Sequence, residues 1–198
     1  MIKAAAPCDP RIERTRRVVL DTTIELLVEG GFGAVTIEAV AARSGVAKST
    51  IYRHWPGRLE LVHAAFHELK PEVPLPVDGD VRDRIVALLE HVARVLTDSK
   101  WSALLPTLIE TAERDPEARE LHARMAEGGH RVLVDLLDDG KRSGELPADL
   151  DSDVIAEALA GPIFLRRLMS STAFDPADVA HLVDQILGAR RPVGETVS

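Results

Sequence analysis

Six side chains that can donate hydrogen bonds lie close together in the segment from residue 48 to residue 54. They supply an ammonium, two hydroxyls, a phenol, a guanidinium and an imidazole, and they are Lys48, Ser49, Thr50, Tyr52, Arg53 and His54. Groups of this kind bind phosphate oxygens and the acceptor-rich edges of base pairs. No nucleophile is paired with a base along the chain. The cluster therefore predicts a surface that binds nucleic acid rather than a catalytic centre.

These donors need a helix that turns its apolar residues the other way. Val46, Ile51 and Trp55 can face a core while the donors stay outside. Gly45 lies just before them, where the chain must turn sharply, and we expect a positive φ there. The segment before Gly45 repeats apolar residues at helical spacing, at Ile37, Val40 and Ala41. The pattern predicts two short helices joined by a glycine turn, the helix-turn-helix that reads DNA.

Two cations stand at predicted helix starts, where acids are normally preferred. Lys48 opens the second helix and Arg58 opens the next one, and Glu60 is the one acid in either first turn. We expect a DNA phosphate to meet each cation together with the free N–H groups of the helix end. The alternative is that exposed cations there cost only about tenths of a kcal/mol and need no partner.

The N-terminal third resembles the DNA-binding domain of the TetR family of bacterial transcriptional regulators. In that family a helix ends in a glycine-aromatic pair, a threonine opens the next helix, and the recognition helix ends in Tyr-x-His-aromatic before a basic residue. The matching residues here are Gly31–Phe32, Thr36, Tyr52-Arg53-His54-Trp55 and Arg58. Pro56 and Leu59 depart from the family pattern, in the link to the next helix, where the family commonly has a lysine and an acid.

The resemblance implies a role for each residue of the predicted surface. Residues near the DNA backbone or in the minor groove are Arg11, Arg14 and Arg16. Phosphate contacts are assigned to Thr36, Lys48, Tyr52 and Arg58, and base contacts to Ser49, Thr50, Arg53 and His54. Among these, we expect Arg53 to be the best partner for a guanine, because a guanidinium can bind its O6 and N7 together.

The charge of the chain is divided unevenly along its 198 residues. The net charge is −8, but residues 1–58 hold nine Lys/Arg against six Asp/Glu, so the excess acid lies in the remainder. An acidic remainder is repelled by DNA and should face away from it. The lone cysteine, Cys8, excludes an internal disulfide, and we assign it no role. With no signal peptide and no membrane-length apolar run, we expect a cytoplasmic protein.

The periodicity predicts an all-α fold of about nine helices and no strands. We place a three-helix helix-turn-helix domain at residues 10–57 and a connecting helix at 58–69. The proline-rich stretch 70–79 reads as the seam before a larger helical domain at 70–190, which would bind an effector and form a dimer. Within that domain, Gly128–Gly129 should weaken one helix and Pro162 should kink another.

Many members of the resembled family hold a small molecule in the second domain. The candidate pocket residues here are Phe66, Trp101, Leu105, Ile109, Met125, Phe164 and Leu168. They include several of the few aromatic residues of this chain, although plain core packing explains each of them as well. The chemical identity of the effector does not follow from the sequence.

The last two predicted helices are apolar on wide faces. In TetR-like proteins the corresponding pair forms a four-helix bundle with its copy in a second subunit. The resemblance therefore implies a homodimer interface with Val154, Ala158, Leu165, Val179, Leu182, Val183 and Ile186 as candidates. The alternative is that these faces are buried within one subunit. A dimer has an independent rationale, since one helix-turn-helix contacts few base pairs and pairing places two reading helices on one duplex.

No cofactor or metal is expected. His63 and His67 have a spacing that can hold zinc, but no further His or Cys cluster lies near them in sequence. Together the observations predict a ligand-responsive transcriptional repressor, without enzyme activity, that binds a palindromic double-stranded DNA operator as a homodimer and has no membrane partner. Two alternatives stay open: a ligand sensor that has lost DNA binding, and an enzyme.

Overall fold

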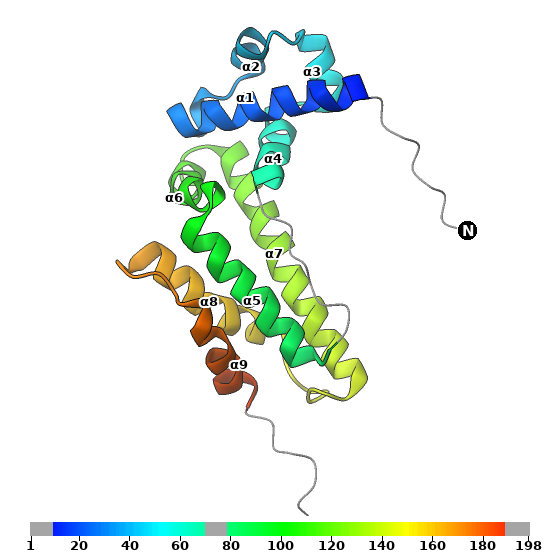
Figure 1. Ribbon diagram of the computed structural model, residues 1–198, viewed down its shortest axis with the longest axis vertical. Coiled ribbons are helices and arrows are strands. Elements are labelled where there is room, and N and C mark those ends of the chain that lie inside the picture. Colours follow the sequence, from blue (N-terminus) through cyan, green and yellow to red (C-terminus); the bar gives the residue numbers. More distant parts are fainter. Residues whose placement is uncertain (1–9, 70–78, 189–198) are drawn as a thin grey trace, which may run out of the picture. The chain divides into compact units, whose positions relative to one another are not determined.

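The computed structural model describes residues 10–69 and 79–188, and within these ranges the chain is helical with no strand (Figure 1). The predicted all-α fold is thus confirmed. Cys8, most of the proline-rich seam and the C-terminal tail lie outside the described residues. The helices are α1 (Pro10–Ala34), α2 (Ile37–Ser44), α3 (Lys48–His54), α4 (Arg58–Leu69), α5 (Val81–Asp98), α6 (Lys100–Ala112), α7 (Pro116–Ser143), α8 (Ser152–Met169) and α9 (Val179–Leu187), with a 3₁₀ turn at Pro176–Asp178.

The chain forms two compact units, which are described separately. Unit 1 contains the residues up to Lys70 together with Ala103–Ala123, and unit 2 contains Pro71–Ser102 and the residues from Arg124 onward. Most of α6 and the first turns of α7 therefore pack with the N-terminal helices. We keep the predicted functional division at residues 57 and 70 as a proposal.

Unit 1 is built around the inner faces of α1 and α4. Val19 and Leu27 of α1 and Leu61 and Val62 of α4 are buried. Near its end α1 is broken at Gly31, whose φ of 69° and ψ of −166° are not helical. Glycine adopts this conformation cheaply because it has no Cβ. After the break, the last turn of α1 places Phe32 in the core.

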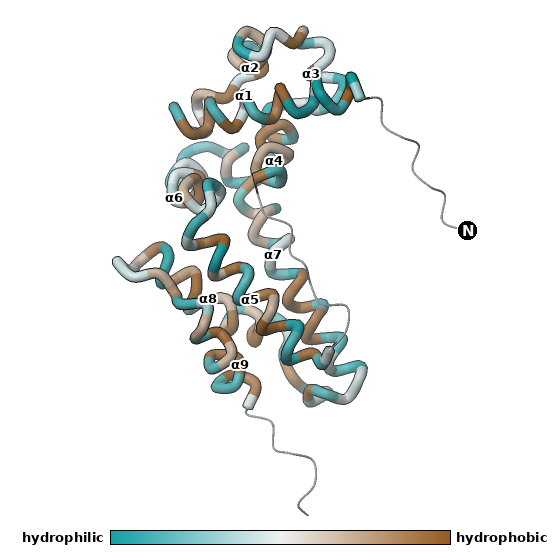
Figure 2. Tube along the Cα trace, viewed as in Figure 1, coloured by the Kyte–Doolittle hydropathy of each residue, from teal (hydrophilic) through white to brown (hydrophobic). Residues whose placement is uncertain are grey.

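Unit 2 has an aliphatic core contributed mainly by α5, α7, α8 and α9. Apolar and polar residues alternate turn by turn along α5 (Figure 2), and its apolar face is buried. The fully buried residues of this core include Ile85, Leu89, Leu137, Leu159, Ile163, Val179 and Val183. At the edge of the core the Arg82 guanidinium forms two hydrogen bonds to Asp184, of 2.6 and 2.9 Å, which join α5 to α9.

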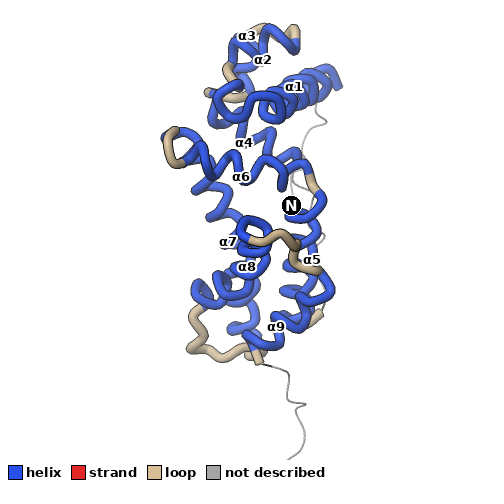
Figure 3. The backbone as a smooth tube through the Cα atoms, turned by 90° about the vertical axis from the view of Figure 1, so that its left-hand side faces the viewer, coloured by secondary structure: helices blue, strands red, loops and turns tan. Residues whose placement is uncertain are grey.

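The predicted weak points do not divide their helices. Helix α7 continues through Gly128 and Gly129, and α8 continues through Pro162 (Figure 3). Both glycines are exposed, so neither leaves a gap in the core. They weaken the helix only through the low helix propensity of glycine. A second internal proline, Pro106 of α6, was not among the predicted helix-breaking residues.

Candidate nucleic-acid interface

The turn between α2 and α3 is fixed by two backbone features. Thr36 precedes α2, and its hydroxyl accepts a hydrogen bond of 3.0 Å from the N–H of Ala39. Gly45 ends α2 with φ 71° and ψ 8°, and its N–H donates to the carbonyl of Ala41 at 3.0 Å. The positive φ predicted for Gly45 is therefore confirmed. This turn sets the direction in which α3 leaves α2.

Helix α3 has two chemically distinct faces. Ile51 and the following Trp55 are buried, as predicted, whereas Val46 is only half-buried. The opposite side presents hydrogen-bonding groups. Of these, Lys48, Ser49, Tyr52 and Arg53 are exposed, and Thr50 and His54 are half-buried. All six predicted contact residues of this helix are thus exposed or half-buried, whereas Ile51 and Trp55 are buried.

Three arginines of α1 are candidates for contacts beside those of α3. Arg11, Arg14 and Arg16 are all exposed. The Arg16 guanidinium carbon lies 5.7 Å from the centre of the Trp55 ring, close enough for a cation–π contact. Arg16 therefore lies next to the C-terminal end of α3.

An ion pair that the sequence did not reveal ties α2 to α1. Two nitrogens of Arg43 bind the two carboxylate oxygens of Glu29, at 2.5 and 2.7 Å. The hydrogen bond from Arg43 is the main cause that lowers the pKa of Glu29. Because the partners are fourteen residues apart on different helices, helical spacing could not have indicated this pair.

Lys48 has a carboxylate partner in this structure. Its Nζ lies 2.7 Å from Oε1 of Glu38, and this hydrogen bond is the main cause that lowers the pKa of Glu38. The expectation that Lys48 lacks an anion without DNA is wrong, because the acid comes from α2 rather than from the first turn of α3. Both side chains are more than half exposed, so water screens the pair and a phosphate can compete for the ammonium.

Arg58 is held much more firmly. Its Nη2 lies 3.1 Å from Oδ2 of Asp115 and its Nε lies 3.4 Å from Oε2 of Glu117, while its guanidinium carbon lies 4.0 Å from the centre of the Phe32 ring. Only 24% of the side chain is exposed. The expectation that Arg58 lacks an anion without DNA is therefore corrected. Its Nη2 donates a hydrogen bond to Asp115, the residue before α7, and Glu117 of the first turn of α7 lies within ion-pair distance, although the buried Nε has no hydrogen-bond partner.

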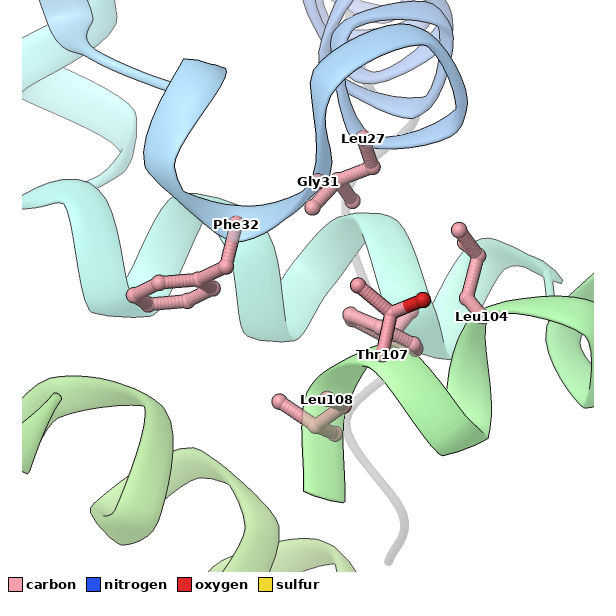
Figure 4. A pocket seen from close by; sticks show the side chains of 7 residues that line it. Leu27, Gly31, Phe32, Leu104, Thr107 and Leu108 are labelled. Carbon is pink, nitrogen blue, oxygen red and sulfur yellow. The ribbon is translucent and has the colours of Figure 1, made fainter. Parts of the chain in front are cut away.

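Unit 1 contains a small apolar cavity between the end of α1, α4 and α6 (Figure 4). It is lined by Leu27, Gly31, Phe32, Phe66, Leu104, Thr107 and Leu108. Its volume of about 10 Å³ is near the lower limit for one water molecule, so it is too small for an organic effector. Phe66 is the one predicted pocket residue among its walls.

The predicted pocket residues are divided between the two compact units. Phe66, Leu105 and Ile109 belong to unit 1, whereas Trp101, Met125, Phe164 and Leu168 belong to unit 2. Leu168 is 40% exposed on α8, so we correct its assignment as a pocket wall. The indole Nε1 of Trp101 is buried with no hydrogen-bond partner. A buried donor without an acceptor is costly and leaves this position able to bind one.

Helix α8 exposes an apolar stripe, defined here as Val154, Ala158, Gly161, Leu165 and Leu168. Val154 is 58% and Leu165 is 61% exposed. The spacing of four, three, four and three residues places all five on one side of the helix. Val179 and Val183 of α9 have no exposed surface, because they face the core of their own chain. We therefore correct the candidate dimer interface by removing these two, while Leu182 and Ile186 are half-buried.

No group of three or more His, Cys, Asp or Glu side chains in residues 10–69 and 79–188 is arranged to hold a metal ion. No helix there combines the length and apolar character that crossing a membrane requires.

Known proteins match this chain along nearly its whole length. A family profile described as "Bacterial regulatory proteins, tetR family" matches residues 19–65, and one described as "Tetracyclin repressor-like, C-terminal domain" matches residues 75–186. YdeS, an uncharacterized HTH-type transcriptional regulator of Bacillus subtilis, is 31% identical over 189 residues, which cover 94% of this chain and 93% of YdeS. The DNA-binding transcriptional repressor TetR of Mycobacteroides abscessus is 26% identical over 183 residues, which cover 89% of this chain and 94% of that protein.

Solved structures share the fold. The TetR family transcription regulator SCO0332 superposes with a TM-score of 0.69 at 29% identity, covering 90% of this chain and 100% of that one. FadR of Bacillus subtilis, solved in complex with stearoyl-CoA, has a TM-score of 0.63 at 18% identity, covering 88% of this chain and 99% of that one. The matched proteins are described as regulators rather than catalysts. With the helix-turn-helix geometry and profiles that span both parts of the sequence, this chain belongs to the TetR family of helix-turn-helix transcriptional regulators.

Proposed function

We propose that this protein is a homodimeric repressor that binds a palindromic DNA operator and releases it when a small molecule binds. The observation that carries the proposal is the outward face of α3, where Ser49, Tyr52 and Arg53 are exposed above the buried Ile51 and Trp55. A surface of flexible donors on a firmly packed short helix suits insertion into a major groove. The name of the Mycobacteroides abscessus relative supports the repressor role.

The residues of this face divide by the atoms they reach. Lys48, Tyr52 and the hydroxyl of Thr36 bind phosphates and set the register of the helix on the duplex. Base edges are read by Ser49, Thr50, Arg53 and His54, and the guanidinium of Arg53 binds a guanine. Arg11, Arg14 and Arg16 extend the contact along the backbone or into the minor groove. Arg58 is absent from this list because its charge is already matched within unit 1.

The apolar stripe of α8 supports the homodimer. Its five residues repeat with the spacing of a helix–helix seam, and Ala158 and Gly161 are small enough to let a second helix approach closely. In a second copy the same stripe would face it across a two-fold axis, with Leu182 and Ile186 of α9 at the border. Two-fold pairing gives a palindromic operator, because each copy then reads one half-site.

An effector site in unit 2 is supported by one chemical feature. The partnerless indole N–H of Trp101 would donate to an acceptor on the ligand, with Met125 and Phe164 as apolar neighbours in the proposal. The fold alone does not identify the ligand class, even though FadR of Bacillus subtilis was solved with stearoyl-CoA. Coupling between effector and operator sites in such proteins is typically about 1–3 kcal/mol.

Selection of bound duplexes from a random DNA pool tests the proposed function. We expect an enriched palindrome whose half-sites are separated by a whole number of helical turns, and a dimer in light scattering at micromolar concentration. Transcription in vitro from a promoter that overlaps the enriched site should fall when the protein is added. Failure to enrich any sequence at low salt would instead favour a sensor without DNA binding.

A further inference from the structure

Arg58 occupies a junction of three helices in unit 1. It is the first residue of α4, its guanidinium covers the ring of Phe32 from the last turn of α1, and its nitrogens face Asp115 and Glu117 at the start of α7. Phe32 itself points toward α4 (Figure 4). A planar guanidinium is well suited to this combination, because it can lie flat on a ring while its edge binds carboxylates.

Asp115, the acid that accepts a hydrogen bond from Arg58, also caps the N-terminus of α7. Asp115 precedes α7, and its Oδ1 accepts hydrogen bonds from the N–H groups of Glu117 and Ala118, at 2.9 and 3.2 Å. Partial burial acts to raise the pKa of Asp115, but these N–H groups and the charge of Arg58 outweigh it and hold the pKa below its usual value. Asp115 is therefore ionised at neutral pH and joins the start of α7 to the start of α4.

The start of α4 is also close to the end of the reading helix. Only Pro56 and Gly57 separate the buried Trp55 from Arg58. Proline fixes its own φ near −65°, so Pro56 removes one of the few torsions of this short link, while Gly57 keeps its own. Arg58 therefore lies three residues along the chain from Trp55, which is buried directly after α3.

We propose that Arg58 is a positioning residue, which fixes the reading helix α3 through Asp115 of the α7 cap and Phe32 of α1, and does not contact DNA. The inference rests on the proposed DNA-binding function and assigns to that site a determinant outside its surface. Two other roles are possible for the same cation. A phosphate contact would act directly on the duplex, and a plain stabilising pair would act on folding alone.

Four single variants of the 198-residue chain, and a double variant that combines Arg58→Gln with Asp115→Asn, separate these roles. Arg58→Gln removes the charge, and Arg58→Lys keeps the charge but loses the planar fork. Asp115→Asn removes the charge while keeping a residue that caps helices about as well as aspartate. Arg114→Gln is the matched control, because Arg114 precedes Asp115 and makes an ion pair with Glu110 that is largely exposed.

The first measurement uses the operator obtained by selection, with half-sites at the selected spacing and at spacings one base pair longer or shorter. We expect Arg58→Gln and Asp115→Asn each to lower affinity for the selected spacing by about tenfold, within the usual range of coupling effects. Discrimination among spacings should fall together with this affinity. Arg58→Lys should keep only part of the wild-type affinity and discrimination. The double variant should bind as well as either single one, and Arg114→Gln should match the wild type.

The salt dependence of binding distinguishes a phosphate contact. A positioning residue leaves the slope of log affinity against log salt unchanged in Arg58→Gln, whereas loss of a phosphate contact lowers its magnitude by about one unit. A lower slope in Arg58→Gln but not in Asp115→Asn would overturn the proposal. Unchanged spacing discrimination with only a lower melting temperature would also overturn it, in favour of a stabilising pair.

Amide hydrogen exchange of the free protein tests the positioning role of Arg58 without DNA. We expect α3 amides to exchange about tenfold faster in Arg58→Gln and Asp115→Asn than in the wild type, since α3 loses its anchor. If the wild type binds no DNA while this change appears, the proposed function fails and the positioning role stands. Unchanged exchange in α3 would overturn the positioning role even if the wild type binds its operator.

Discussion

The outward faces of α3 and α8 differ in chemistry although their inward faces are alike. Each helix packs aliphatic or aromatic residues inward, Ile51 with the adjoining Trp55 for α3 and Leu159 with Ile163 for α8. Outward, α3 presents hydroxyl, phenol and guanidinium groups, whereas α8 presents its apolar stripe. An inward face indicates only that a helix belongs to a fold. The outward face is the basis of the partner that we propose for each helix: an anionic, acceptor-rich surface for α3 and a second apolar surface for α8.

Removing an inward residue of α3 should give the largest effect. Trp55→Ala is expected to lower the free energy of unfolding by about 3–5 kcal/mol, because a large buried side chain leaves a cavity. Tyr52→Ala, on the outward face of the same helix, should change it by no more than about 0.5 kcal/mol. Urea denaturation followed by circular dichroism measures both. Equal losses for the two variants would mean that Tyr52 belongs to the core.

A charge in the apolar stripe of α8 should disrupt the proposed dimer. Leu165→Glu is expected to raise the dissociation constant of the dimer by about a hundredfold or more, since it removes an exposed leucine that the proposed dimer would bury and places like charges across the two-fold axis. Val132→Glu, a similar change at a partly exposed position of α7, should leave the dimer intact. Sedimentation velocity over a concentration series gives the comparison. A dimer that tolerates Leu165→Glu would place the interface elsewhere.

A substitution in the reading face should change sequence preference rather than assembly. Arg53→Ala is expected to reduce discrimination at one base pair of each half-site by about 1–3 kcal/mol, the contribution of a two-pronged contact to guanine. Binding to operators with each of the four base pairs at every position measures it. If the preference profile keeps its shape while affinity falls uniformly, Arg53 binds phosphate instead.

Lys48 should give a smaller effect of a different kind. Its pair with Glu38 is more than half exposed, so a phosphate can displace the carboxylate. Lys48→Gln is expected to weaken binding to all sequences alike and to lower the salt slope by about one unit. The comparison with Arg58→Gln is direct, because both residues are cations that open helices. An unchanged slope for Lys48→Gln would mean that Glu38 keeps the ammonium in the complex.

The helix-turn-helix could be predicted in detail because its determinants are local. The positive φ of Gly45, the burial of Ile51 and Trp55 and the exposure of Arg53 all follow from residue types within a few positions of one another. The same is true of the capping threonine, Thr36. Helix propensity, turn geometry and hydrophobic periodicity all predict the same structure for this segment.

The ionic partners could not be predicted because they depend on tertiary distances. Lys48 and Arg58 look alike as cations at helix starts, and the sequence places no acid beside either in the same turn except Glu60. Their partners come from other helices, ten residues away for Lys48 and fifty-seven for Arg58. The ion pair of Lys48 is exposed and that of Arg58 is largely buried. This difference depends on the fold and not on the local sequence, and it is why we propose Lys48, and not Arg58, as a phosphate contact.

The apolar faces of the last two helices were ambiguous for a similar reason. Periodicity marks which residues share a face but not which of two apolar faces turns inward. In α9 the inward positions are Val179 and Val183, and in α8 the outward stripe includes Leu168, which was assigned to a pocket. Only packing against α5 and within unit 2 separates core residues from those left for a partner.

Lowering the pH should have the smallest effect among these tests, because the apolar stripe of α8 has no ionisable group. One ion pair of unit 2, between Arg82 and Asp184, joins α5 to α9, and the hydrogen bonds from Arg82 are the main cause that lowers the pKa of Asp184. A carboxyl whose pKa is lower in the folded state binds protons less readily there than when unfolded. Its stabilising contribution is therefore complete above the unfolded pKa of about 4 and is lost as the pH falls through the folded pKa.

The stability difference between the wild type and Asp184→Asn should therefore be constant from pH 7 to about 5 and shrink steadily below about pH 4. Urea denaturation at each pH measures this difference, and the Leu165→Glu variant provides a background in which the proposed dimer no longer contributes to stability. A difference that grows as the pH falls would have the wrong sign for a lowered pKa. It would mean that Asp184 is held as the neutral acid, and that the α5–α9 contact does not depend on the charge of Arg82.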